Sequence, residues 1–193
     1  ISGENHPFVK AFEFVRDHVS DGTQVKQTIP APAQFLEELL RPENQENLKE
    51  IYPNLDDFDH DVAAAYHQVI EELYAAGCRT LQLDDCTWGI SVNNFANLKK
   101  KDPNADTSQL VALQERFLKV NNAAIADLPD DLTINTHVCR GNYHSTWAAA
   151  GGYGPVADTL FAQENVKAFY LEYDSERAGG FEPLAKVPDE KYV

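Results

Sequence analysis

The sequence places an imidazole and a thiol two residues apart, at His137 and Cys139, where a β-branched, alternating run that begins at Leu132 comes to its end. Residues two apart in an extended strand point to the same side, so both side chains should leave the strand end together. This pair suits a soft, tetrahedral divalent ion, above all Zn²⁺. The alternative is structural, because histidine and cysteine are also frequent in protein cores.

Two other predicted strands also end in acidic residues. One ends in Asp84 and Asp85, followed directly by Cys86, and the other is an almost wholly apolar run that ends in Glu172. A carboxylate in such a place is either solvated near a helix cap or positioned to bind something. Next to the imidazole and thiol of the preceding strand, Glu172 becomes a third candidate metal ligand.

The elements that must position these residues follow from apolar spacing and from turn residues. Strands are expected over 24–29, 80–85, 132–139 and 166–173, and helices over 6–19, 32–40, 59–76, 107–128 and 155–163, with a helix-containing insertion over 41–57. Alternating strands and helices predict a parallel α/β sheet. The sequence lacks the glycine-rich first turn of a doubly wound sheet, which favours a (β/α)₈ TIM barrel with its catalytic residues at several strand ends. Only about four strands are found, so residues 1–193 are predicted to form one partial TIM-barrel domain, roughly half of a barrel.

Composition narrows the class of protein. The formal net charge of −15 argues against a nucleic-acid or anionic-membrane partner, since phosphates are bound by clustered Lys and Arg. No apolar run approaches the ~20 residues of a membrane span. The three cysteines do not resemble a secreted disulfide framework, so a reducing cytoplasm is expected. The chain starts without methionine and ends in a polar stretch, which suggests part of a longer protein, and a homo-oligomer is compatible with the sequence.

The segments LQLDDCTW, THVCRGNYHSTWAAAGGY and AFYLEYDSERAG resemble the catalytic barrel of cobalamin-independent methionine synthases, and still more their shorter single-barrel paralogues. The resemblance runs from about residue 26 to 183. It implies a zinc-dependent methyltransferase of methionine biosynthesis that moves a methyl group from a methylated tetrahydrofolate to the thiol of homocysteine. It also implies that His137, Cys139 and Glu172 are zinc ligands and that Asp84 binds the substrate ammonium.

The chain departs from the family pattern at two points. The family's strand-end motif usually reads Asp-Glu-Pro, whereas this chain has Asp84, Asp85 and Cys86, which puts the role of Asp85 in doubt. The family's second zinc cysteine follows the glutamate on a later strand, and this chain has none there. Cys86 is the only internal replacement, because Cys78 precedes its strand and reads as a core thiol. We expect the fourth ligand to lie outside this stretch.

Further polar and aromatic residues follow the same strand ends. Four could stack on a flat pterin or could simply pack loops against the barrel rim: Trp88, Tyr143, His144 and Trp147. Arg140 and Arg177 could meet a substrate carboxylate or form surface ion pairs. Weaker candidates are Asn135 and Ser145, because amides and hydroxyls in loops often cap backbone groups.

Three other functions remain compatible with these residues. The zinc could serve alkyl transfer to another small thiol, or hydrolysis with Asp84 or Asp85 as base. A non-catalytic or metal-free relative is the last alternative. A thiolate among the ligands favours alkyl transfer over hydrolysis, because binding a substrate sulfur to zinc deprotonates it and keeps it reactive.

Overall fold

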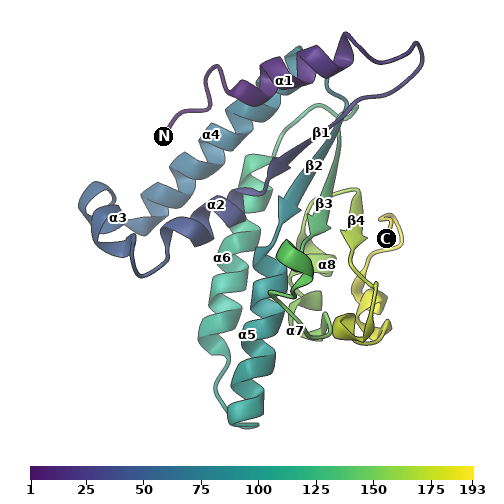
Figure 1. The fold of residues 1–193 in the computed structure, drawn as a ribbon. Coiled ribbons are helices and arrows are strands. Elements are labelled where there is room, and N and C mark those ends of the chain that lie inside the picture. The colour runs from purple at the N-terminus through teal and green to yellow at the C-terminus, as the bar shows by residue number, and fades with distance from the viewer.

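A computed structural model describes all residues, 1–193, as a four-stranded sheet with helices (Figure 1). The strands are β1 (Lys26–Pro30), β2 (Thr80–Asp85), β3 (Thr133–Val138) and β4 (Ala168–Leu171). The α-helices are α1 (Pro7–Arg16), α2 (Pro32–Leu39), α3 (Gln45–Ile51), α4 (Leu55–Ala75), α5 (Thr87–Lys101), α6 (Ser108–Ala124), α7 (Gly154–Ala157) and α8 (Leu160–Gln163). Three short 3₁₀ turns complete the chain: η1 (Tyr143–Ser145), η2 (Glu176–Ala178) and η3 (Glu182–Lys186).

The four strands are all parallel and lie side by side in the order of the chain, β1-β2-β3-β4. Helices connect each strand to the next, so the carboxyl ends of all four strands meet at one edge. The register pairs Asp84 with His137 and Asp85 with Val138. The predicted parallel α/β architecture is therefore confirmed. These residues do not include the further strands that a complete barrel would need.

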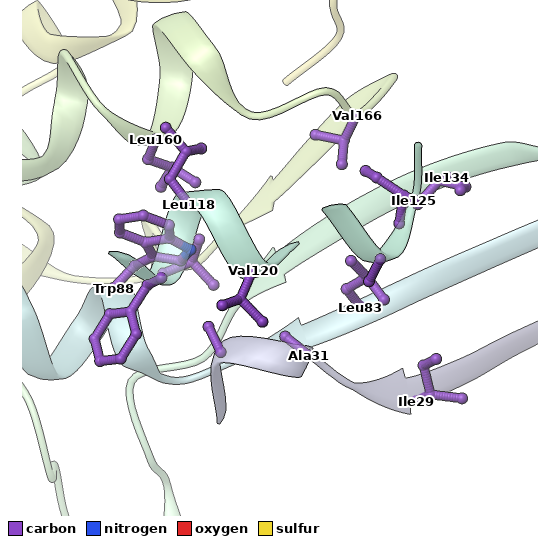
Figure 2. Close-up of a cluster of buried hydrophobic side chains, with 14 of the residues drawn as sticks. Ile29, Ala31, Leu83, Trp88, Leu118, Val120, Ile125, Ile134, Leu160 and Val166 are labelled. Carbon is purple, nitrogen blue, oxygen red and sulfur yellow. The ribbon is translucent and has the colours of Figure 1, made fainter. Parts of the chain in front are cut away.

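The two faces of the sheet have different environments. Along β2, Leu81, Leu83 and Asp85 are buried, whereas Gln82 and Asp84 between them are only half-buried. The buried side carries the core, in which apolar side chains of the first three strands and of α6 belong to one cluster (Figure 2). The other side presents the polar residues of each strand. Strand alternation therefore separates a packing face from a face that can bind ligands.

Local signals explain the best-predicted elements. Helix α4 begins after Asn54, whose side chain accepts a hydrogen bond from the Asp56 N–H, and ends before Gly77, which has a φ of +102°. Pro32 opens α2 in the first turn, as expected. The helix predicted over 155–163 is instead two short helices, because the chain leaves the α-helix between Ala157 and Leu160.

Helix α5 is not among the predicted elements, and it corrects one candidate residue. The sequence pattern places Trp88 in a loop at the active edge, but this residue lies in the first turn of α5 and is 0% exposed. Its ring lies in the core with Leu118 and Leu160 (Figure 2). Trp88 therefore stabilises the fold and cannot stack on a ligand.

None of the helices combines the length and the apolar character that crossing a bilayer requires.

Candidate metal and thiol site

His137 lies at the centre of the candidate site, where β3 ends between β2 and β4. Its Nδ1 is 3.2 Å from Asp84 Oδ1, and its Nε2 is 3.6 Å from Glu172 Oε1. Its side chain is 26% exposed, so one edge of the ring is open to solvent. Residues from three neighbouring strands are thus brought together, as strand-end placement predicted.

The two contacts of His137 differ in kind. A proton on Nδ1 donated to Asp84 leaves Nε2 with a lone pair that faces a carboxylate oxygen of Glu172. A metal ion placed between two such acceptors would be bound by both of them. Two ligands of a tetrahedral Zn²⁺ ion lie about 3.4 Å apart, close to the observed separation. A carboxylate on the far nitrogen of a ligating histidine is also the usual arrangement around zinc.

Glu172 is held in place by three donors. Its Oε2 accepts hydrogen bonds from the Arg140 backbone N–H at 3.1 Å and from Arg177 Nη2 at 3.2 Å, and its Oε1 accepts one from Asn142 Nδ2 at 3.1 Å. The side chain of Arg177 is buried, and it also contacts Asp174. The sequence suggests a substrate contact or a surface ion pair for Arg177. In the structure it fixes the orientation of the candidate ligand instead.

Cys139 is paired with a second thiol, that of Cys86. Their side chains form a hydrogen bond, which lowers the pKa of Cys139 to about 6 and raises the pKa of Cys86. The Cys139 sulfur also accepts a hydrogen bond from the Gly141 N–H at 3.3 Å, which stabilises a thiolate. These hydrogen bonds favour a thiolate at Cys139 over one at Cys86.

The side chains of His137, Cys139 and Glu172 are of types that bind Zn²⁺, and the distance between His137 Nε2 and Glu172 Oε1 also fits. An imidazole, a thiolate and a carboxylate are all ordinary zinc ligands. However, no three His, Cys, Asp or Glu side chains converge closely enough to enclose an ion. The sulfur of Cys139 is held towards Cys86 and Gly141, so completing a site would require its side chain to turn towards His137.

Asp84 and Asp85 face opposite sides of β2. Asp84 is on the open side, where Gln82 Nε2 donates to its Oδ1 at 2.7 Å, and its side chain is 41% exposed. Its Oδ2 has no protein partner and can meet a ligand's ammonium group. Asp85 is completely buried against the helices and accepts hydrogen bonds from Thr87 and Asn121. Asp85 therefore has a structural role, and the expectation that it could act as a base on water is wrong.

The loop after β3 presents two of the predicted aromatic residues to solvent. Tyr143 is 84% exposed and Trp147 is 50% exposed, and the Arg177 guanidinium lies 5.2 Å from the Trp147 ring centroid. His144 and Ser145 have positive φ values in the same loop and are also exposed. These side chains are free to contact a ligand.

Arg140 and Asn135 turn away from solvent. Arg140 is buried, its guanidinium stacks on Tyr153 at 4.3 Å, and its Nη1 donates to the Gly151 carbonyl at 2.8 Å. It is therefore not the surface ion-pair partner considered from the sequence. Asn135 is buried on β3, between the strands that flank it.

Three residues that support the site were not found from the sequence. Gln82 orients Asp84, and Asn142 holds Glu172. Gly89 allows α5 to approach β3, because a Cβ at this position would lie 2.5 Å from the Cys139 carbonyl oxygen. Only Gln82 carried a usable signal, because it lies two residues before Asp84 on the same face of a predicted strand.

Comparison with known proteins identifies relatives that are about twice as long. No protein-family model matches the chain. Two uncharacterized Bacillus subtilis proteins, YxjG and YxjH, are each 40% identical, over 188 and 183 residues. The alignments cover 97% and 95% of this chain but 47% and 46% of those proteins. The chain therefore spans about half the length of the curated relatives it matches.

Two solved structures share the fold. A provisionally assigned vitamin-B12-independent methionine synthase from Listeria monocytogenes matches all of this chain and 51% of its own, with 34% identity and a TM-score of 0.72. A B12-independent methionine synthase from Shewanella sp. W3-18-1, in complex with selenomethionine, matches 96% of this chain and 48% of its own. At 19% identity and a TM-score of 0.57, the second match supports the fold alone.

Proposed function

We propose that this chain, a relative of the cobalamin-independent methionine synthase family, forms half of a (β/α)₈ barrel that transfers a methyl group to a thiol in methionine biosynthesis. The acceptor in this proposal is homocysteine, and the donor is a methylated tetrahydrofolate. One observation carries it: His137 lies between Asp84 and Glu172, which come from two other strand ends. In the relatives, the other half of the barrel would come from the part of their sequence that this chain does not match.

His137, Cys139 and Glu172 would hold Zn²⁺. The ion, when bound, would keep a substrate sulfur deprotonated at neutral pH and still nucleophilic. The hydrogen bond to Asp84 Oδ1 fixes the tautomer of His137, so that its Nε2 faces Glu172. The three donors on Glu172 would fix the orientation of that carboxylate as a ligand.

The remaining residues would bind and orient the substrates. Asp84 Oδ2, which is unpaired and exposed on the open side of the sheet, would receive the ammonium group of the amino-acid thiol. The exposed rings of Tyr143 and Trp147 would stack on the pterin of the donor. Placing sulfur and methyl group in line then supplies much of the rate, because reacting groups need not find each other by diffusion.

Metal analysis and a thiol titration test the proposal together. The wild-type chain should retain Zn²⁺ after dialysis, whereas His137→Ala and Cys139→Ser should lose most of it. Cys78→Ser is the matched control, because Cys78 is buried beside the opposite end of β2. Unchanged zinc content in Cys139→Ser would refute the assignment of the ligands.

Cobalt substitution distinguishes the acceptor. Homocysteine added to the Co²⁺-loaded chain should intensify the sulfur-to-cobalt absorption as its thiolate enters the coordination shell, and Asp84→Asn should weaken that response. A stronger response to a thiol without an ammonium group would favour alkyl transfer to another small thiol. No response to any thiol would contradict thiol transfer.

A further inference from the structure

The sulfur atoms of Cys86 and Cys139 meet where β2 and β3 end. The parallel register pairs Asp85 with Val138, and the ladder continues through a hydrogen bond from the Cys139 N–H to the Asp85 carbonyl at 3.2 Å. Cys86 and Cys139 are the residues that follow this pair, and Cys86 already begins the turn into α5. The side chain of each cysteine is the largest influence on the pKa of the other thiol, which puts the two sulfurs near each other, and both residues are half-buried.

This placement fits a disulfide bond. Neighbouring strands lie about 4.8 Å apart, which is within the Cα separation of ~4.4–6.8 Å that disulfides bridge. Cys86 is the N-cap residue of α5, but its side chain makes no capping hydrogen bond, so its sulfur is not needed there. Gly89 keeps the first turn of α5 close to Cys139. The third cysteine, Cys78, cannot compete, because the six residues of β2 separate it from Cys86 by about 20 Å.

We propose that Cys86 and Cys139 form an oxidant-reactive dithiol, which hydrogen peroxide converts into a disulfide across the ends of β2 and β3. The sulfur of Cys139 attacks the peroxide, so that an S–O bond forms, the O–O bond breaks and one water leaves. The sulfur of Cys86 then attacks Cys139, so that the S–S bond forms, the S–O bond breaks and a second water leaves with the Cys86 proton. Two thiols lose two electrons in total, and one peroxide gains them.

The disulfide would change the candidate site directly. It ties the Cys139 sulfur to Cys86, so that this sulfur is no longer a thiolate that can bind a metal ion. A thiol reductant would reduce the disulfide and restore the free thiol of Cys139. The inference goes beyond the proposed function and does not depend on it, because the contact between the two cysteine side chains comes from the fold of this chain alone.

Oxidation of the metal-free chain by one equivalent of hydrogen peroxide tests the dithiol. The number of titratable thiols under denaturing conditions should fall from three to one, and the intact monomer mass should fall by two hydrogens. Peptide mapping should join Cys86 to Cys139, and a reductant should restore all three thiols. Cys78→Ser, the control, should still form the bond, and its thiols should fall from two to none.

The variant Cys86→Ser tests whether Cys86 is the partner of Cys139 in the disulfide. In this variant, Cys139 has no resolving partner, so the product should be an oxygen adduct on Cys139 and no internal disulfide. The proposal is overturned if wild-type protein gives the same oxygen adduct as Cys86→Ser, or keeps all three thiols. It is also overturned if the mapped disulfide includes Cys78 or links two chains.

Discussion

Replacing Glu164 by glutamine should make the stability of the fold less dependent on pH. Glu164 is fully buried, and its Oε1 accepts a hydrogen bond from Asn121 Nδ2 at 2.9 Å. The same amide nitrogen donates to Asp85 Oδ2, also at 2.9 Å. Burial first, and then the charge of Asp85, raise the pKa of Glu164 to about 8. Glu164 is therefore mostly protonated at neutral pH.

The sign of the effect follows from proton binding in the two states. In the unfolded chain, Glu164 loses its proton near the ordinary glutamate pKa of 4.5, whereas the folded chain keeps it up to a pKa of about 8. The folded state binds more protons in this window, so the free energy of unfolding falls as pH rises from about 4.5 to about 8. At roughly 1.4 kcal/mol per pH unit, the full window corresponds to at most about 5 kcal/mol. We expect on the order of 3 kcal/mol to be observed, because a buried site relaxes when it ionises.

Glutamine cannot ionise, but it keeps the oxygen that accepts the hydrogen bond from Asn121. Urea unfolding at pH 5, 7 and 8.5 should give Glu164→Gln about the stability of wild type at pH 5 and a gain of about 3 kcal/mol at pH 8.5. Glu115→Gln, an exposed change on α6, should follow the wild-type pH profile. A Glu164→Gln profile parallel to wild type across this range would refute the protonated buried acid.

Three further changes test the contacts around the strand ends. Gln82→Leu removes the 2.7 Å hydrogen bond to Asp84. The KM for an amino-acid thiol should then rise about fivefold, which corresponds to ~1 kcal/mol of lost binding free energy. The zinc content measured by metal analysis should stay unchanged. Gly89→Ala brings a Cβ within 2.5 Å of the Cys139 carbonyl, and should cost about 1–3 kcal/mol in urea unfolding and slow disulfide formation. Trp88→Ala should lower the free energy of unfolding by about 3–5 kcal/mol, because the ring is fully buried. Trp147→Ala should change the free energy of unfolding by less than about 0.5 kcal/mol, because the ring is half exposed. The same Trp147 variant should bind a reduced folate more weakly, as measured by fluorescence.

The strand ends could be predicted from the sequence because they depend on local pattern. Strand β2 is expected over 80–85 and has these bounds. His137 and Glu172 lie at the ends of their predicted strands, and their side chains are near each other in the structure. In a parallel sheet the carboxyl ends share an edge, so residues far apart in the chain could be expected to meet there. The predicted parallel α/β sheet is confirmed for the same reason.

Helix α5 could not be predicted because its own residues favour it weakly. It begins Thr87-Trp88-Gly89-Ile90-Ser91-Val92, a run of glycine, β-branched and hydroxyl residues with low helix propensity. Burial of its inner side chains, Trp88 among them, stabilises it against the core. Tertiary packing of this kind is not visible in a local window, so an aromatic residue just after a strand resembles a loop residue.

The contacts of long polar side chains could not be predicted from the sequence either. Arg140 could be expected in a substrate contact or on the surface, and the structure instead stacks it on Tyr153, which lies after a long loop. Arg177 reaches back to Glu172 and to Asn142 on the loop after β3. A guanidinium on a long stem can reach many partners, so its sequence position does not determine which one it contacts.

The two adjacent acids of β2 show how one strand couples the candidate site to the helices. Alternation sends Asp84 to His137 on the open face and Asp85 to the helix layer. Asp85 accepts from the Thr87 N–H at the start of α5 and from Asn121 on α6, and Asn121 Oδ1 in turn accepts from the Ala33 N–H of α2 at 2.9 Å. Because Cys86 lies directly after this anchor, the buried network of Asp85 fixes where the Cys86 sulfur meets Cys139. The buried acids therefore position the strand end without contacting any ligand.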